Sequence, residues 1–276
     1  MRGALDAARD AYWLAPGQAC DISFRPASAA ALSDARAVVE RVASTLPVDW
    51  AIQEVEGRRK MLLVADMDST IIQQECLDEI AVLAGIGPQI AAITERAMRG
   101  ELDFESALRE RVGLLKGFPL ARLQEVLETS ITLTPGATQL TATMRSHGGR
   151  CVLVSGGFTF FTGAVAKLAG FNTHFGNSFL TENDAITGVA DPILGKDAKL
   201  ATLKAEAQGQ GIGLSETMAV GDGANDLDML KAAGLGVAFH AKPIVAREAA
   251  ARVDHGDLTS LLYLQGYRQQ DFVDRF

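Results

Sequence analysis

Two aspartates, Asp66 and Asp68, directly follow an apolar run at residues 61–65, and two hydroxyl residues come next. Such a run predicts a buried parallel strand, and open α/β sheets bind ligands at the carboxyl ends of their strands. In an extended segment, one ligand could use the Asp66 side chain and the Asp68 backbone carbonyl, which leaves the Asp68 side chain free for proton transfer. A single aspartate here is more often a turn former. The pair predicts a catalytic site.

Polar groups also follow two further predicted strands. Ser155 and two glycines come after Cys151–Val154, and the segment at 221–226 comes after Met218–Val220 with Asp222, Asn225 and Asp226. Glycines on both sides of Asp222 would let the backbone approach a metal or a phosphate closely. Taken alone, the serine segment is a tight turn, and a lone lysine such as Lys199 is a surface residue. The three strand ends together favour a shared site.

Arg111 lies on the apolar stripe of a predicted helix, seven residues after Phe104. An arginine on a buried face needs an anionic partner. That partner is either an acid of the protein itself or a carboxylate or phosphate of a ligand at a domain interface, and the sequence leaves both open. Periodicity gives no such support to Glu75, which falls away from the apolar face of its helix.

Composition excludes some classes of partner. The 276 residues are 48% hydrophobic and 22% charged, with a formal charge of −8, which is unsuited to nucleic acid or anionic membranes. The three cysteines are far apart and form no metal-binding pair, as is typical of reduced thiols in the cytosol. The chain has no apolar run of roughly 18 residues and no apolar signal core. We therefore predict a cytoplasmic protein with neither nucleic acid nor membrane partners.

The order of predicted elements indicates an α/β fold with a doubly wound parallel sheet and an inserted helical cap. Residues 1–58 form a small α+β appendage, with strands predicted at Cys20–Phe24 and Asp49–Val55 around a helix at Ala29–Ser44. Residues 59–74 and 134–276 form the core, and residues 75–133 the cap. The cap contains four consecutive predicted helices, at Gln73–Ala84, Pro88–Met98, Asp103–Lys116 and Pro119–Thr129. Helices and strands then alternate over Ala137–His147, Cys151–Val154, Phe160–Ala169, Ala198–Gln208, Met218–Val220, Asp226–Ala233 and Gly236–Phe239.

Four segments resemble, in chain order, the motifs of the haloacid dehalogenase-like superfamily: residues 66–70, residues 155–157, Lys199 and residues 221–226. Within the superfamily, Glu75, residues 104–112 and residues 154–158 are similar to the phosphoserine phosphatase family. The resemblance covers about residues 60–265. It implies a Rossmann-like core, an α-helical cap and hydrolysis of a small phosphomonoester. Residues 1–58 fall outside it, and they look too short for the regulatory-type domains of longer members.

The resemblance implies a catalytic role for each aspartate. Asp66 attacks phosphorus, and Asp68 protonates the departing oxygen and then activates water. Two acids beside a phosphate dianion would repel it, and hard oxygen ligands point to Mg²⁺ as the counterion. The ion would bind the Asp66 carboxylate, the Asp68 carbonyl and Asp222, with Asp226 supporting the site through water or a hydrogen bond.

The resemblance also assigns the substrate contacts. Lys199 would hold the phosphoryl group and keep Asp66 ionised, with Ser155, Gly156 and Asn225 as further phosphoryl contacts. Arg111 would bind the substrate carboxylate and Glu75 its ammonium group, while Met98 and Phe104 exclude water. The implied reaction is Mg²⁺-dependent hydrolysis of O-phospho-L-serine, the last step of serine biosynthesis, by a monomer or homodimer. Two alternatives stay open: another phosphomonoester such as phosphohomoserine, and a non-catalytic sensor of serine or phosphate.

Overall fold

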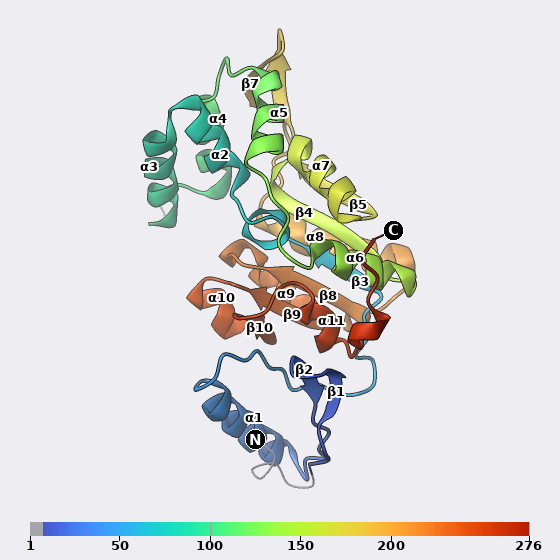
Figure 1. Ribbon diagram of the computed structural model, residues 1–276. Helices are drawn as coiled ribbons and strands as arrows, with labels where there is room; N and C mark the ends of the chain where they lie inside the picture. Colours follow the sequence, from blue (N-terminus) through green and yellow to red (C-terminus); the bar gives the residue numbers. More distant parts are fainter. Residues whose placement is uncertain (1–7, 100, 276) are drawn as a thin grey trace.

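A six-stranded parallel sheet forms the centre of the computed structural model, which describes residues 8–99 and 101–275 without the side chain of Met98. The strand order is β10-β9-β8-β3-β4-β5 (Figure 1). The strands are β3 (Leu62–Ala65), β4 (Arg150–Phe158), β5 (Thr173–Asn177), β8 (Thr217–Gly221), β9 (Leu235–Phe239) and β10 (Ala251–Val253). The strand that precedes Asp66 is therefore central, with β4 and β8 as its neighbours.

Helices cover both faces of this sheet, which confirms the predicted doubly wound fold. Alternate residues of β3 enter two different cores, as a period of two requires. Leu63 and Ala65 pack with α6 (Ala137–Ser146), α7 (Thr159–Ala169) and α11 (Ser260–Leu264). Leu62 and Val64 pack with α8 (Lys196–Gln210), α9 (Leu227–Ala232) and α10 (Pro243–Glu248). No described helix is both long enough and apolar enough to cross a membrane.

In the described part of the chain, four α-helices lie between β3 and α6 and gather at one end of the molecule (Figure 1). They are α2 (Cys76–Ala84), α3 (Gly87–Met98), α4 (Phe104–Gly113) and α5 (Leu120–Thr129). Local signals set their ends: the Asp103 side chain accepts the Ser106 N–H at the start of α4, and Gly85 ends α2 with φ 72°. All four were expected from the sequence, although the first begins at Cys76 rather than Gln73.

A β-hairpin that was not predicted from the sequence extends from the core and contacts the helical insert. It consists of β6 (Phe179–Glu182) and β7 (Ala185–Val189), and its turn residues Asn183 and Asp184 both have positive φ. The Gly117 N–H donates to the Ile186 carbonyl at 2.8 Å, and the Ile186 N–H donates to the Phe118 carbonyl at 2.9 Å. The hairpin thus pairs with the α4–α5 connection rather than with the main sheet.

The amino-terminal segment forms a small α+β unit at the opposite end of the molecule (Figure 1). Strand β1 (Tyr12–Ala15) pairs with β2 (Ala19–Asp21), and α1 (Ala29–Ala43) packs beside them. The prediction of a strand at Asp49–Val55 was wrong, since this segment makes only an isolated bridge between Trp50 and Arg252. Its polar groups bind a loop instead: the Asp49 carboxylate accepts the backbone N–H groups of residues 254–256.

Candidate active site

The chain stays extended as it leaves β3, and this places Asp66 and Asp68 in one cavity. Asp66 (φ −68°, ψ 158°) and Asp68 (φ −66°, ψ 136°) have extended backbones, and Ser69 turns the chain with φ 54°. Met67 between them is buried in the core. Both carboxylates line a cavity of about 150 Å³, as the strand-end pattern predicted.

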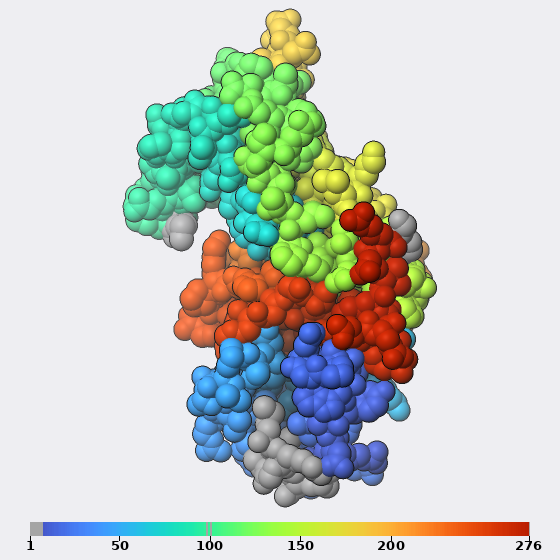
Figure 2. Space-filling view, viewed as in Figure 1, coloured from blue at the N-terminus to red at the C-terminus, as the bar shows by residue number. Residues whose placement is uncertain are grey.

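The cavity lies between the carboxyl ends of β3, β4 and β8 and the helical insert. Figure 2 shows the molecule hollowed between the teal helices of the insert and the orange segment that includes α10. Among the described residues, Lys199 and Asp226 are buried behind the cavity wall, and the predicted contact by the Met98 side chain lies outside the description. The other predicted site residues line the cavity: Asp66, Asp68, Glu75, Phe104, Arg111, Ser155, Gly156, Asp222 and Asn225.

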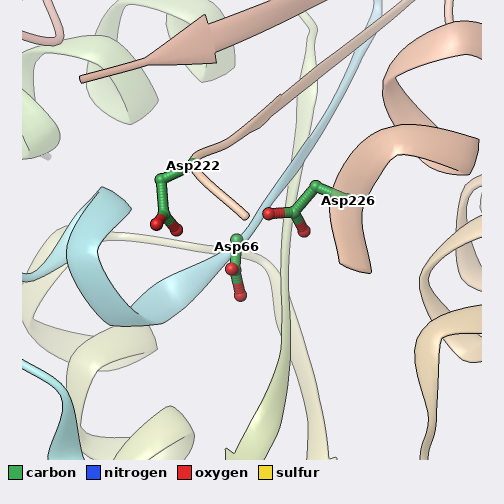
Figure 3. Close-up of side chains that lie close together, drawn as sticks. All are labelled: Asp66, Asp222 and Asp226. Carbon is green, nitrogen blue, oxygen red and sulfur yellow. The ribbon is translucent and has the colours of Figure 1, made fainter. Parts of the chain in front are cut away.

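Three buried carboxylates from two strand ends meet beside the cavity (Figure 3). Oxygen atoms of Asp66, Asp222 and Asp226 lie within 4.8 Å of one another. Lys199 Nζ from α8 lies 2.8 Å from Asp66 Oδ1 and 2.6 Å from Asp226 Oδ1. The Asp226 Oδ2 atom accepts the Gly223 N–H at 3.0 Å, so both oxygens of Asp226 have protein donors. This arrangement favours a supporting role for Asp226.

The cluster carries more negative charge than its one lysine balances. Burial raises the pKa of Asp66 well above its usual value, Asp226 raises it further, and Lys199 only partly opposes them. Lys199 acts in the expected direction, because its charge and hydrogen bond lower the pKa of Asp66, and the same ammonium group also pairs with Asp226. Burial, with Asp226 beside it, also raises the pKa of Asp222 to about 6. A cation bound among these oxygens would restore their ionised forms.

Asp68 is held by hydrogen bonds to both of its oxygens. Oδ1 accepts the backbone N–H of Cys76 at 2.9 Å, and Oδ2 accepts the Ser155 hydroxyl at 3.0 Å. Burial raises its pKa, and the charge of Glu75 acts in the same direction. A raised pKa suits a group that must carry a proton and then lose it.

The segment Ser155-Gly156-Gly157 is the extended end of β4 rather than a tight turn. Strand β4 continues through Ser155-Gly156-Gly157 to Phe158, and α7 begins only at Thr159. Ser155 Oγ accepts the Gly157 N–H at 2.8 Å while it donates to Asp68. A methyl group on Gly156 would come within 2.9 Å of Phe104 Cζ, so the cap ring lies against the backbone of this loop. A side chain at position 156 would therefore require the Phe104 ring to move.

Two oppositely charged side chains of the insert face the carboxylates across the cavity. Glu75 precedes α2, and its Oε1 accepts the Ser69 hydroxyl at 2.7 Å. Arg111 Nε donates to the Ala107 carbonyl at 3.3 Å, and within residues 8–99 and 101–275 no ion pair joins Arg111 to a carboxylate. Burial lowers the pKa of Arg111, although Asp78 and Glu75 partly compensate. A guanidinium that pairs with no carboxylate among the described residues supports the second sequence alternative, a ligand anion.

Sequence reasoning missed several residues that line the cavity, of which Lys242 is the most informative. Lys242 Nζ lies 3.9 Å from Asp222 Oδ2, and the Lys242 N–H donates to the Asp222 carbonyl at 3.1 Å. Its position after β9 was the available signal, because that strand ends on the same edge of the sheet. The other missed residues of the wall are Cys76, Leu77, Leu108, Gly157, Phe158 and Gly223.

Comparison with known proteins gives consistent matches. A family model described as haloacid dehalogenase-like hydrolase matches residues 63–231. The chain is 48% identical over 204 residues to a phosphoserine phosphatase of Haemophilus influenzae, covering 74% of this chain and 65% of that relative. It is 44% identical over 212 residues to a phosphoserine phosphatase of Streptococcus thermophilus, covering 76% of this chain and 96% of that relative.

A solved structure of a phosphoserine phosphatase with a phospho-aspartyl intermediate analogue matches with a TM-score of 0.68 and 38% identity. The match covers 74% of this chain and 98% of that one. The fold and the family are thus shared with these proteins over the region that contains the cavity. The chain spans just under two thirds of the length of the Haemophilus relative.

Proposed function

This chain belongs to the haloacid dehalogenase-like hydrolases, and from that premise we propose that it hydrolyses O-phospho-L-serine to L-serine and phosphate. One observation carries the proposal: a small cavity has a carboxylate cluster with a buried lysine on one wall and Glu75 and Arg111 on the other. The first wall suits a phosphoryl group with a cation. The second suits an ammonium group and a carboxylate on the same small molecule.

The donor set at the cluster fits Mg²⁺. Three carboxylates and one ammonium group leave two negative charges unbalanced, and all the acidic donors are hard oxygen atoms. Asp66, Asp222 and the Asp68 carbonyl would hold the ion, with Asp226 held by Lys199 and Gly223 in support. A bound Mg²⁺ would neutralise charge on the phosphoryl oxygens and keep the aspartates ionised.

The residues of the chain divide the reaction into two steps. An oxygen of Asp66 attacks phosphorus, and the bond to the serine oxygen breaks as Asp68 donates a proton to that oxygen. In the second step Asp68 takes a proton from water, whose oxygen attacks phosphorus and releases Asp66. Lys199, Ser155, Asn225 and the Gly156 backbone would hold the phosphoryl oxygens. Positioning and fixed charge must supply most of the acceleration, since proton transfer contributes only about 10²–10⁴-fold.

Three segments of the chain have distinct proposed roles. Residues 75–133 would act as a cap over the core formed by residues 59–74 and 134–276, with Phe104 and Met98 excluding water. Residues 1–58 would be a structural appendage. We place the protein in the cytoplasm, where the free thiols of Cys20, Cys76 and Cys151 would stay reduced, and we expect a monomer or homodimer. The proposed reaction would complete serine biosynthesis.

Phosphate release from L-phosphoserine tests the proposal. Release is expected with Mg²⁺ and not with EDTA, and Asp66→Asn should abolish both turnover and acid-labile labelling of the protein by phosphate. Faster release from phosphohomoserine would reassign the substrate within the family. No release from any phosphomonoester, combined with binding of serine, would favour the sensor instead.

A further inference from the structure

The two oxygens of Asp68 have donors of different kinds. Oδ1 accepts from a backbone amide, that of Cys76 at 2.9 Å, and Oδ2 accepts from a hydroxyl, that of Ser155 at 3.0 Å. Cys76 is the first residue of α2, and its side chain is buried. The amide is therefore held in place by the helix, whereas a hydroxyl can rotate its hydrogen toward another acceptor.

The backbone N–H of Cys76 can only donate a hydrogen bond. It therefore influences which oxygen of Asp68 carries the proton when the carboxyl group is protonated. In a carboxylic acid the carbonyl oxygen accepts a hydrogen bond better than the hydroxyl oxygen does. An N–H directed at Oδ1 therefore favours Oδ1 as the carbonyl oxygen and places the proton on Oδ2.

Oδ2 is also the oxygen on the side of the segment Ser155-Gly156-Gly157. A methyl group on Gly157, a residue of the cavity wall, would lie 3.1 Å from Asp68 Oδ2 and 3.0 Å from Ser155 Oγ. When a phosphoryl oxygen enters, the Ser155 hydroxyl can turn its hydrogen toward it and release Oδ2. The Ser155 oxygen keeps the Gly157 N–H as a donor during this rotation.

We propose that the backbone N–H of Cys76 selects Oδ2 of Asp68 as the oxygen that exchanges protons with the substrate and with water. The inference rests on the proposed function and adds a positioning group to it. In the first step the proton leaves Oδ2 for the departing serine oxygen, which takes the electron pair of the P–O bond. In the second step Oδ2 regains a proton from the attacking water. Because the amide belongs to the first turn of α2, the first cap helix orients the acid.

The test removes the N–H without removing the helix. Proline is tolerated at the first position of a helix, and Glu75 before it already has an extended backbone (φ −95°, ψ 108°) that a following proline accepts. Cys76→Pro is compared with Cys76→Ala, which also loses the thiol but keeps the N–H. Replacement of the amide at position 76 by an ester removes the same hydrogen with the side chain intact, and it decides the question if the proline variant does not fold.

The readout is the ratio of kcat/KM for L-phosphoserine to kcat/KM for p-nitrophenyl phosphate. An alkoxide needs a proton in order to leave, whereas nitrophenolate does not, so a misdirected acid affects only the first substrate. We expect this ratio to fall at least about tenfold in Cys76→Pro and in the ester relative to Cys76→Ala. Equal losses for both substrates would show a structural role, and no loss would show that the amide is dispensable. Either result overturns the inference.

The same assays keep the two proposals separate. Turnover of L-phosphoserine by the unmodified chain tests the proposed function alone. If another alkyl phosphate is the better substrate, the ratio is measured with that substrate, and the role of the amide is judged independently.

Discussion

Lys199 Nζ lies 2.8 Å from Asp66 Oδ1, with both side chains buried. The same ammonium group contacts Asp226, so it holds the proposed nucleophile in place and offsets part of the buried negative charge. Lys199→Met should lower turnover by about 10²–10³-fold, because a fixed cation beside the phosphoryl group is lost.

The same substitution should also destabilise the metal-free protein. Loss of the ammonium group leaves two buried carboxylates without their partner, which should cost about 3–5 kcal/mol in the free energy of unfolding. Urea unfolding and steady-state kinetics measure both effects. Lys204→Met, an exposed position on the same helix, is the matched control. Normal turnover and stability in Lys199→Met would contradict the assigned contacts.

Magnesium should stabilise the protein, and more strongly at neutral than at acid pH. Burial raises the pKa of Asp222 from 3.8 to about 6. A raised folded-state pKa of an acid gives a contribution to stability that is present below pH 3.8 and lost as the pH rises to about 6. Bound Mg²⁺ would replace those protons, so the rise in Tm on adding it should be larger near pH 7.5 than near pH 5.

Thermal unfolding with EDTA or Mg²⁺ at the two pH values measures this difference. In Asp222→Asn, most of the rise in Tm on adding Mg²⁺ should be lost, because the substitution removes a metal ligand and the titrating group together. An equal rise in Tm at both pH values in the unmodified chain would argue against the carboxylate cluster as the metal site.

Arg111 should determine affinity for the substrate carboxylate. We expect Arg111→Ala to raise the KM for L-phosphoserine by about tenfold to a hundredfold, since a charge-assisted hydrogen bond contributes about 1.5–3 kcal/mol. Phosphoethanolamine keeps the ammonium group and lacks the carboxylate, so its KM should change little. If the KM values of both compounds rise together, Arg111 supports the cap rather than the substrate.

Glu75 should determine affinity for the substrate ammonium group. Glu75→Gln keeps an oxygen that can accept the Ser69 hydroxyl and loses only the charge. The KM for L-phosphoserine should rise about tenfold or more, while that for 3-phosphonooxypropanoate, which lacks the amino group, should not. A similar rise for the two compounds would instead indicate that Glu75 acts by holding the turn at Ser69.

Asp49 should attach the amino-terminal unit without affecting catalysis. Its carboxylate accepts the N–H groups of Asp254 and Gly256 at 2.7 and 2.8 Å. The amino-terminal unit lies at the end of the molecule away from the cap helices (Figure 1). Asp49→Ala should lower the free energy of unfolding by about 1–3 kcal/mol, because those amides lose a charged partner. Turnover of L-phosphoserine should stay within a factor of two or so of the unmodified value. Asp34→Ala, on α1, is the control, and a large loss of turnover would assign the unit a catalytic influence.

Much of the architecture could be predicted because its signals are local. Apolar runs predict β3, β8 and β9, and glycine or proline at helix ends predicts the four cap helices. The strand β5 could not be predicted, because Thr173–Asn177 has no apolar run and becomes a strand only by pairing with β4. The strand predicted at Asp49–Val55 also depends on pairing, and here the contact with β10 stays a single bridge between Trp50 and Arg252.

The sequence by itself determined that Asp66, Asp68 and Asp222 reach one edge of a parallel sheet, because strand periodicity and chain direction require it. Only the tertiary structure decided which groups share a partner. It buries Lys199 between two carboxylates and directs the Ser155 hydroxyl to Asp68. Among the described residues, Arg111 forms no ion pair with a carboxylate. These contacts join segments far apart in the chain, so their distances and burial depend on how the helices pack against the sheet rather than on any local pattern.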